Sequence, residues 1–200
     1  MGTSVLAATR ELEPLKYINS INKPVHSAMF YNDEKKSRYI EYTFILNGLK
    51  KEERCIYVTD ENTNQIAAKM KACGISLEKF FEKRLLHIYQ VPSLQGSISN
   101  IVDNAKKIIE EIVSDTKQPC RLVGRIIRDT ATKNGMMAEM QLEKEFHKSF
   151  SGFNGTVLCS YPYQQIESTQ RERWMSGLLY NHHSAIFVPR DSQGIAVAFT

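Results

Sequence analysis

The chain has 200 residues, 42% of them hydrophobic and 24% charged, which argues against a disordered protein, and no apolar stretch approaches the length of a membrane span. The net charge of +4 comes from basic residues scattered among acidic ones, so nucleic-acid binding is not expected. We predict one domain over residues 23–200 after a loosely attached lead-in of residues 1–22, and a cytoplasmic location because no secretory signal is present.

Short apolar runs alternate with amphipathic segments from Val25 onward, a pattern typical of strand–helix units around a mostly parallel sheet. Helices are expected between the strands, and the clearest covers residues 98–112, where isoleucines recur on one face. The sequence therefore predicts a three-layer α/β fold with helices on both faces. The expected strands are residues 25–31, 54–59, 85–91, 120–127 and 155–161, with antiparallel edge strands at 184–189 and 194–200.

Polar and aromatic residues follow several of these strands. In an open parallel sheet, ligands bind beyond the carboxyl ends of the strands, where loops converge and helix N-termini expose N–H groups. Here those loops contain residues 31–34, residues 59–61, Arg125 with Arg128, and residues 161–163. We interpret them as a recognition ring, although each residue alone could serve as a helix cap or in a turn.

The first of these loops lacks the features of a phosphate-binding loop. Such a loop needs glycines, so that backbone N–H groups can approach the phosphates, followed by Lys and Ser or Thr. Residues 31–43 read YNDEKKSRYIEYT, without a glycine, and Asp33 and Glu34 would repel phosphate. No familiar hydrolase motif occurs elsewhere. We therefore predict that the chain is not an enzyme.

Neither a metal nor a cofactor is predicted. The four cysteines show no CxxC pair or zinc-site spacing, and Cys55, Cys120 and Cys159 lie in apolar runs typical of buried free thiols. His26 and His87 each stand alone in a strand, and His182 and His183 would need a third ligand to hold a metal.

Two family resemblances are carried by longer segments. Residues 44–91 resemble the part of KaiC- and RadA-like ATPases that follows their phosphate-binding loop. The closer resemblance, over residues 25–190, is to the MEDS domain, the sensory domain of DcmR-type regulators. Glu52-Glu53 departs from that family's Gly-Glu turn, and the aromatic residue after its fourth strand is missing. The matching residues are His26, Phe30-Tyr31, Asp33, Gly48-Leu49, CIYVTDE at 55–61, Arg121, Gly124, Glu143, Cys159, Tyr161, Leu178-Leu179 and His182.

The resemblance implies a RecA/KaiC-like fold that senses a small molecule, such as a hydrocarbon derivative. Because no output domain is visible, signalling would pass through a homo-oligomer or a separate output protein, a kinase or a transcription regulator. Two alternatives are a catalytically dead ATPase relative that acts as an oligomeric scaffold or regulator, and an enzyme with His26 or Glu143 as base. The ring and the resemblance together predict a ligand site of His26, Tyr31, Asp33, Thr59, Asp60, Glu61, Arg121, Glu143 and Tyr161.

Overall fold

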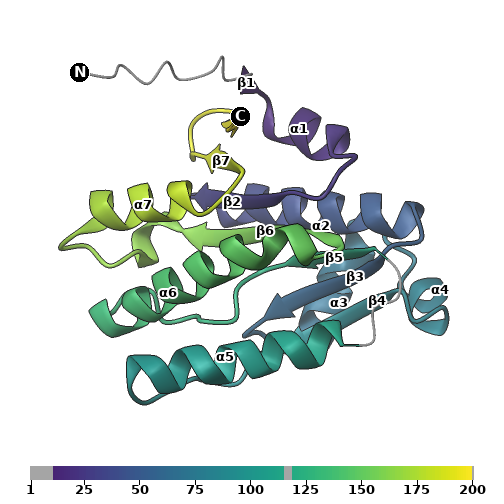
Figure 1. Cartoon of the computed structure of the whole chain (residues 1–200). Helices are drawn as coiled ribbons and strands as arrows, with labels where there is room; N and C mark the ends of the chain where they lie inside the picture. The colour runs from purple at the N-terminus through teal and green to yellow at the C-terminus, as the bar shows by residue number, and fades with distance from the viewer. Residues whose placement is uncertain (1–10, 115–118, 200) are drawn as a thin grey trace.

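A computed structural model describes residues 11–114 and 119–199, and this part of the chain forms one eight-stranded sheet (Figure 1). The strand order is β1-β8-β7-β2-β6-β5-β3-β4. Strands β2 to β7 pair in parallel, whereas β8 is antiparallel to both β7 and β1. The strands are β1 (Glu11–Leu12), β2 (His26–Tyr31), β3 (Arg54–Thr59), β4 (Leu86–Gln90), β5 (Cys120–Val123), β6 (Gly155–Pro162), β7 (Ser184–Val188) and β8 (Ile195–Ala198).

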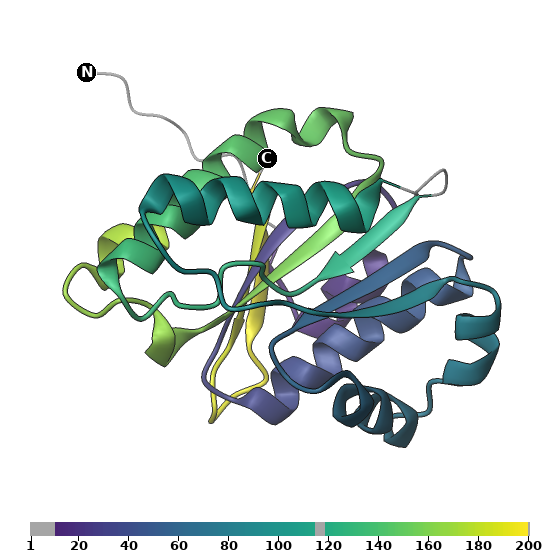
Figure 2. The ribbon, with the colours of Figure 1, turned by 90° about the horizontal axis from the view of Figure 1, so that it is seen from below.

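Helices cover both faces of the sheet, which confirms the predicted three-layer α/β architecture (Figure 2). One face carries α1 (Pro14–Ser20), α2 (Glu34–Lys50), α3 (Thr63–Ala72) and α4 (Leu77–Glu82). The other carries α5 (Ile98–Val113), α6 (Lys133–Ser149) and α7 (Arg171–Tyr180), and short 3-10 turns lie at residues 150–152 and 163–165. Among the described residues, no helix combines the length and apolarity needed to cross a membrane.

Alternation along the central strand divides the core into two. On β2, Ala28 and Phe30 face the α5–α6–α7 side, whereas Met29 and Tyr31 face the α2 side. The predicted apolar face of α5 packs into the first of these cores. Each fully buried aliphatic side chain there contributes about 1.5–3 kcal/mol of transfer free energy.

The predicted lead-in is wrong from residue 11 onward, and residues 1–10 lie outside the described residues. Strand β1 extends the sheet through its pairing with β8. In α1, Ile18 is only 1% exposed and the Tyr17 hydroxyl donates to Ser184 Oγ at 2.6 Å. This segment therefore belongs to the folded domain.

Two glycines shift the predicted boundaries around the fourth strand. That strand ends at Val123 because Gly124 has φ = 109°, and a Cβ there would lie 2.3 Å from the Val58 carbonyl oxygen. Gly135, beyond the end of that predicted strand, lies in the first turn of α6, where a Cβ would lie 1.6 Å from the Asp129 carbonyl oxygen. Both glycines let the backbone pack closely beside the carboxyl ends of the strands.

Candidate functional site

The nine residues predicted to form one ligand site occupy three separate regions. Arg121 lies on β5 under α2, and His26, Glu143 and Tyr161 lie in a buried cluster under α6. His26 is the first residue of β2, at the opposite end of the strand from Tyr31. The remaining five lie at or just beyond the carboxyl ends of β2 and β3: Tyr31, Asp33, Thr59, Asp60 and Glu61.

The position of a phosphate-binding loop is filled by the cap of α2. Helix α2 begins at Glu34, because the Asp33 carboxylate accepts a hydrogen bond from the Lys36 backbone N–H at 3.0 Å. That bond is the main cause that lowers the pKa of Asp33. The Ser37 hydroxyl donates to the Glu34 carbonyl, and Lys36 Nζ donates to the Arg190 carbonyl at 2.6 Å. Asp33, Lys36 and Ser37 thus have hydrogen-bond partners within the chain.

Beside this cap, charged side chains at the strand ends neutralise one another. Arg38 of α2 donates to the Tyr57 hydroxyl and forms an ion pair with Glu61, which also pairs with Lys69. Tyr57 in turn donates to Glu41 at 2.5 Å. The Thr59 hydroxyl accepts from the Glu61 N–H at 3.0 Å and so shapes the turn after β3. Thr59 and Glu61 therefore have structural partners.

An open crevice lies at the carboxyl ends of β3, β4 and β5, and we call it the strand-end crevice. Its volume is about 800 Å³. Val91, Leu94, Ile101 and Ile127 supply apolar lining, and Arg128 and Asp60 form an ion pair at its edge. The first turn of α6 also lines it, so this 17-residue helix directs its positive end toward the crevice. The full lining is Asp60, residues 91–96, Ile101, residues 127–129 and residues 132–135.

Arg121 forms a buried structural pair and has no access to the crevice. Its guanidinium donates to both carboxylate oxygens of Glu53, at 2.6 and 3.2 Å, and to the Phe44 carbonyl at 3.1 Å. The group also lies 4.6 Å from the centre of the Phe44 ring. Arg121 is only 1% exposed, and its contacts with Glu53 and Phe44 stabilise the packing of α2 on the sheet.

A buried polar cluster lies between β2, β6 and α6. His26 Nε2 lies 3.2 Å from Glu143 Oε2 and 3.3 Å from Cys159 Sγ, and His182 Nε2 lies 3.6 Å from the same Glu143 oxygen. The Tyr161 hydroxyl lies 2.6 Å from Glu143 Oε1. We define the buried cluster as His26, Glu139, Glu143, Cys159, Tyr161 and His182, all of them buried.

The two carboxyl groups of the cluster differ in protonation. Burial, with the neighbouring Glu143 charge, raises the pKa of Glu139 to about 8. Burial also opposes ionisation of Glu143, but the two imidazoles and the hydrogen bonds from His26 and Tyr161 lower its pKa below the usual range. The Tyr161 hydroxyl lies 3.0 Å from Glu139 Oε1 and has one hydrogen, which it donates to the ionised Glu143. Protonated Glu139 can supply the hydrogen for the second contact.

The cluster has no room for an organic ligand. A cavity of about 40 Å³ adjoins it, lined by Glu139, Glu143, Cys159 and apolar side chains that include Phe146 and Phe153. This volume suits a water-sized molecule, whereas small-molecule sites usually measure about 300–1,000 Å³.

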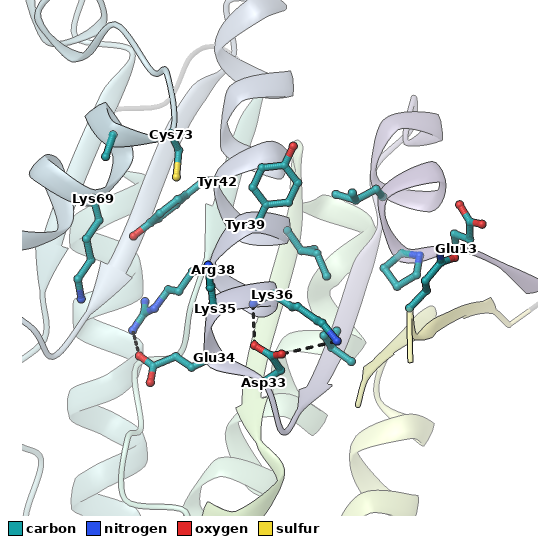
Figure 3. A pocket seen from close by; sticks show the side chains of 16 residues that line it. Glu13, Asp33, Glu34, Lys35, Lys36, Arg38, Tyr39, Tyr42, Lys69 and Cys73 are labelled. Atoms are coloured by element: carbon teal, nitrogen blue, oxygen red, sulfur yellow. Dashed lines mark hydrogen bonds and ion pairs between the residues drawn. The ribbon is translucent and has the colours of Figure 1, made fainter. Parts of the chain in front are cut away.

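A second large concavity, of about 1130 Å³, lies over the outer side of α2 (Figure 3). We call it the α2 groove. Asp33, Tyr39 and Tyr42 line it from the turn before α2 and from α2 itself, together with Pro14 at the α1 end and Lys69 of α3. Tyr39 is 55% exposed. The groove therefore offers an aromatic surface with charged edges.

The chain was compared with known proteins once this geometry was defined. Residues 25–176 match the family model MEDS, the methanogen/methylotroph DcmR sensory domain. The chain belongs to the MEDS family. No curated protein sequence matches it. Among solved structures, this MEDS domain is similar to a KaiC-like protein from the hyperthermophilic archaeon Pyrococcus horikoshii OT3, with 15% identity, a TM-score of 0.60, and coverage of 90% of this chain and 79% of that one.

The family match makes this chain a sensory domain, and the structural likeness confirms the predicted RecA/KaiC-like fold. The predicted residues did not include Glu139, Cys159 or His182 of the buried cluster, or Arg128 of the crevice. Signals for them existed: Cys159 and His182 are part of the MEDS resemblance, and Glu139 and Glu143 share one helix face at i, i+4 spacing.

Proposed function

We propose that this MEDS domain senses a small organic molecule bound in the strand-end crevice, without converting it. The observation that supports this is the combination, in one 800 Å³ space, of apolar lining, the Arg128–Asp60 pair and the first turn of α6. A small amphipathic ligand fits such a lining, because its hydrocarbon part can contact Leu94 and Ile127 while a polar group meets Arg128 or the helix N–H groups.

The contacts at the strand ends support a non-catalytic role. In this proposal the cap at Asp33 and the bonds of Lys36 and Ser37 replace the groups that bind nucleotide phosphates in ATPases. The nearby acids Asp60 and Glu61 are ion-paired, with Arg128 and with Arg38. In this proposal Asp60, which borders the crevice, positions Arg128 and does not act as a general base.

A thermal-shift screen tests the proposal. The panel contains short-chain alcohols, aldehydes, carboxylates, amines and halogenated alkanes. A ligand at a hundred times its Kd adds about 2.7 kcal/mol, which corresponds to about 5–10 °C for a domain of this size. Ser93→Trp fills the crevice from its exposed rim and should abolish the shift, whereas the control Ser176→Trp, exposed on α7, should not. No shift with any compound, or equal shifts in both variants, argues against the proposal.

A second candidate function, favoured by the α2 groove, is assembly: the domain acts as an oligomeric scaffold or docks on an output protein. The exposed Tyr39 lines this groove (Figure 3), and the groove is larger than the crevice. Helix α2 packs on the opposite face of the sheet from α7. Light scattering over a concentration series tests self-assembly. If the groove is the interface, Tyr39→Glu makes the protein monomeric, whereas Tyr180→Glu, at an 83% exposed position on α7, does not. A wild-type monomer at the highest concentration excludes the homo-oligomer.

A further inference from the structure

Four side chains that commonly bind transition metals converge inside the buried cluster. His26 comes from β2, Glu143 from α6, Cys159 from β6, and His182 from the turn after α7. One ligand atom from each lies within 4.8 Å of the other three. All four residues are buried, so their polar groups lie close together away from solvent.

Three of the six distances between these atoms are close to the edges of a tetrahedral site. Zinc bonds of about 2.0–2.1 Å to nitrogen or oxygen and about 2.3 Å to sulfur give tetrahedral edges of about 3.3 Å between N and O and about 3.5 Å between N and S. The observed separations are 3.2 and 3.6 Å from Glu143 Oε2 to the two imidazole nitrogens, and 3.3 Å from His26 Nε2 to Cys159 Sγ.

The hydrogen bonds around His182 leave two acceptor atoms facing each other, and this arrangement favours a cation between them. Its Nδ1 lies 2.6 Å from the Leu178 carbonyl oxygen, and because a carbonyl cannot donate, Nδ1 must carry the hydrogen. In a neutral imidazole, Nε2 then presents a lone pair to the Glu143 carboxylate. This Nε2 atom has no hydrogen-bond partner within the described part of the chain. Two acceptors that face each other in the interior repel unless a cation lies between them.

Outer contacts hold two of the four ligands, His182 and Glu143, as they do around protein-bound zinc, whereas His26 Nδ1 has no hydrogen-bond partner among the described residues. The Nδ1–H bond from His182 to a backbone carbonyl fixes the ring orientation, which is the usual arrangement for a metal-binding histidine. Tyr161 donates to Glu143 Oε1 and thereby leaves Oε2 directed at both histidines. The thiolate and the carboxylate each carry one negative charge, and the two imidazoles are neutral. A divalent ion bound by all four groups therefore leaves no net charge in the buried site.

We propose that His26, Glu143, Cys159 and His182 bind one zinc ion in a closed structural site. Binding releases the Cys159 thiol proton and the water ligands of hydrated Zn²⁺ to solvent, and it moves the hydrogen of His26 from Nε2 to Nδ1. One Zn–S bond, two bonds to imidazole nitrogens and one bond to a carboxylate oxygen form in their place. Because the ligands come from β2, β6, α6 and the turn before β7, the ion ties α6 and the end of α7 to the sheet. Three residues expected to contact an organic ligand, His26, Glu143 and Tyr161, then belong to the metal site and its support.

Reconstitution of the full chain, with any affinity tag removed, tests this site. Wild-type protein should bind one equivalent of Zn²⁺. With Co²⁺ as probe it should show a thiolate-to-cobalt charge-transfer band and the intense d–d bands of a tetrahedral site. Cys159→Ala should lose the charge-transfer band and weaken metal binding at least about tenfold. The control Cys120→Ala, at a buried thiol of β5 outside the cluster, should keep both properties.

A wild-type stoichiometry below about a tenth of an equivalent, or a cobalt spectrum without a thiolate band, would overturn the proposal. So would an unchanged cobalt spectrum in Cys159→Ala. If that variant fails to fold, the wild-type spectrum still decides the question. These measurements do not depend on the strand-end crevice. The zinc site can therefore be refuted while ligand binding in the crevice is supported, and ligand binding in the crevice can be refuted while the zinc site is supported.

Discussion

Arg121 was expected to contact a ligand, and its surroundings predict a structural role. In Arg121→Met the apolar stem remains while the guanidinium is lost, which leaves Glu53 without its bidentate partner and the Phe44 carbonyl without a donor. Removing one member of a buried ion pair costs about 3–5 kcal/mol. We expect the lower end of that range, since the Glu53 side chain is 15% exposed and can be partly solvated.

Urea unfolding followed by circular dichroism measures this loss. About 3 kcal/mol lowers Tm by about 6–12 °C in a domain of this size. The control Arg173→Met removes an exposed arginine of α7 and should change stability by less than about 0.5 kcal/mol. Glu53→Gln completes a double-mutant cycle, with an expected coupling of about 1–3 kcal/mol. A loss below about 1 kcal/mol in Arg121→Met, or zero coupling, would refute the structural assignment.

Three further predictions concern single side chains. The Glu167 carboxylate accepts hydrogen bonds from the Trp174 indole N–H and from the backbone N–H groups of Thr169 and Gln170. These bonds lower the pKa of Glu167 to about 2. The stability that the ionised carboxylate contributes above pH 4.5 should therefore be lost as the pH falls toward 2. Glu167→Gln should flatten that acid-side slope in unfolding measured across pH; an unchanged slope contradicts the assignment. Gly124→Ala should cost about 3 kcal/mol or more in urea unfolding, because alanine is strained at φ = 109° and its Cβ meets the Val58 carbonyl; a wild-type midpoint would contradict this. Tyr161→Phe should cost about 1–3 kcal/mol by removing the donor to buried Glu143, and equal stability would show that the hydroxyl contributes nothing.

The strand–helix order could be predicted because each element carries its own local pattern. Strand β3 and helix α5 lie where the apolar spacing indicates. The integration of residues 11–22 could not be predicted, because β1 depends on pairing with β8, almost the whole chain away in sequence. Likewise, the end of β5 depends on how closely Gly124 approaches Val58.

The candidate sites show the same division between local and long-range information. The rule for strand ends points to Asp60 and the loop containing Arg128, and both border the crevice. His26 entered the predicted site through the family resemblance, which does not reveal the strand face or the strand end that a side chain occupies. The four residues of the proposed zinc site could not be grouped from the sequence, because they are spread from residue 26 to residue 182 without the short spacing of a sequence motif.

The most direct test of ligand sensing is chemical-shift mapping of the best compound from the screen. Amide resonances of ¹⁵N-labelled protein should move at residues 91–96 and 127–135, around the strand-end crevice, and saturate with added compound. Residues 33–42 of the α2 groove should stay unchanged. Saturable shifts confined to the α2 groove, or none around the crevice, would contradict the proposed binding site.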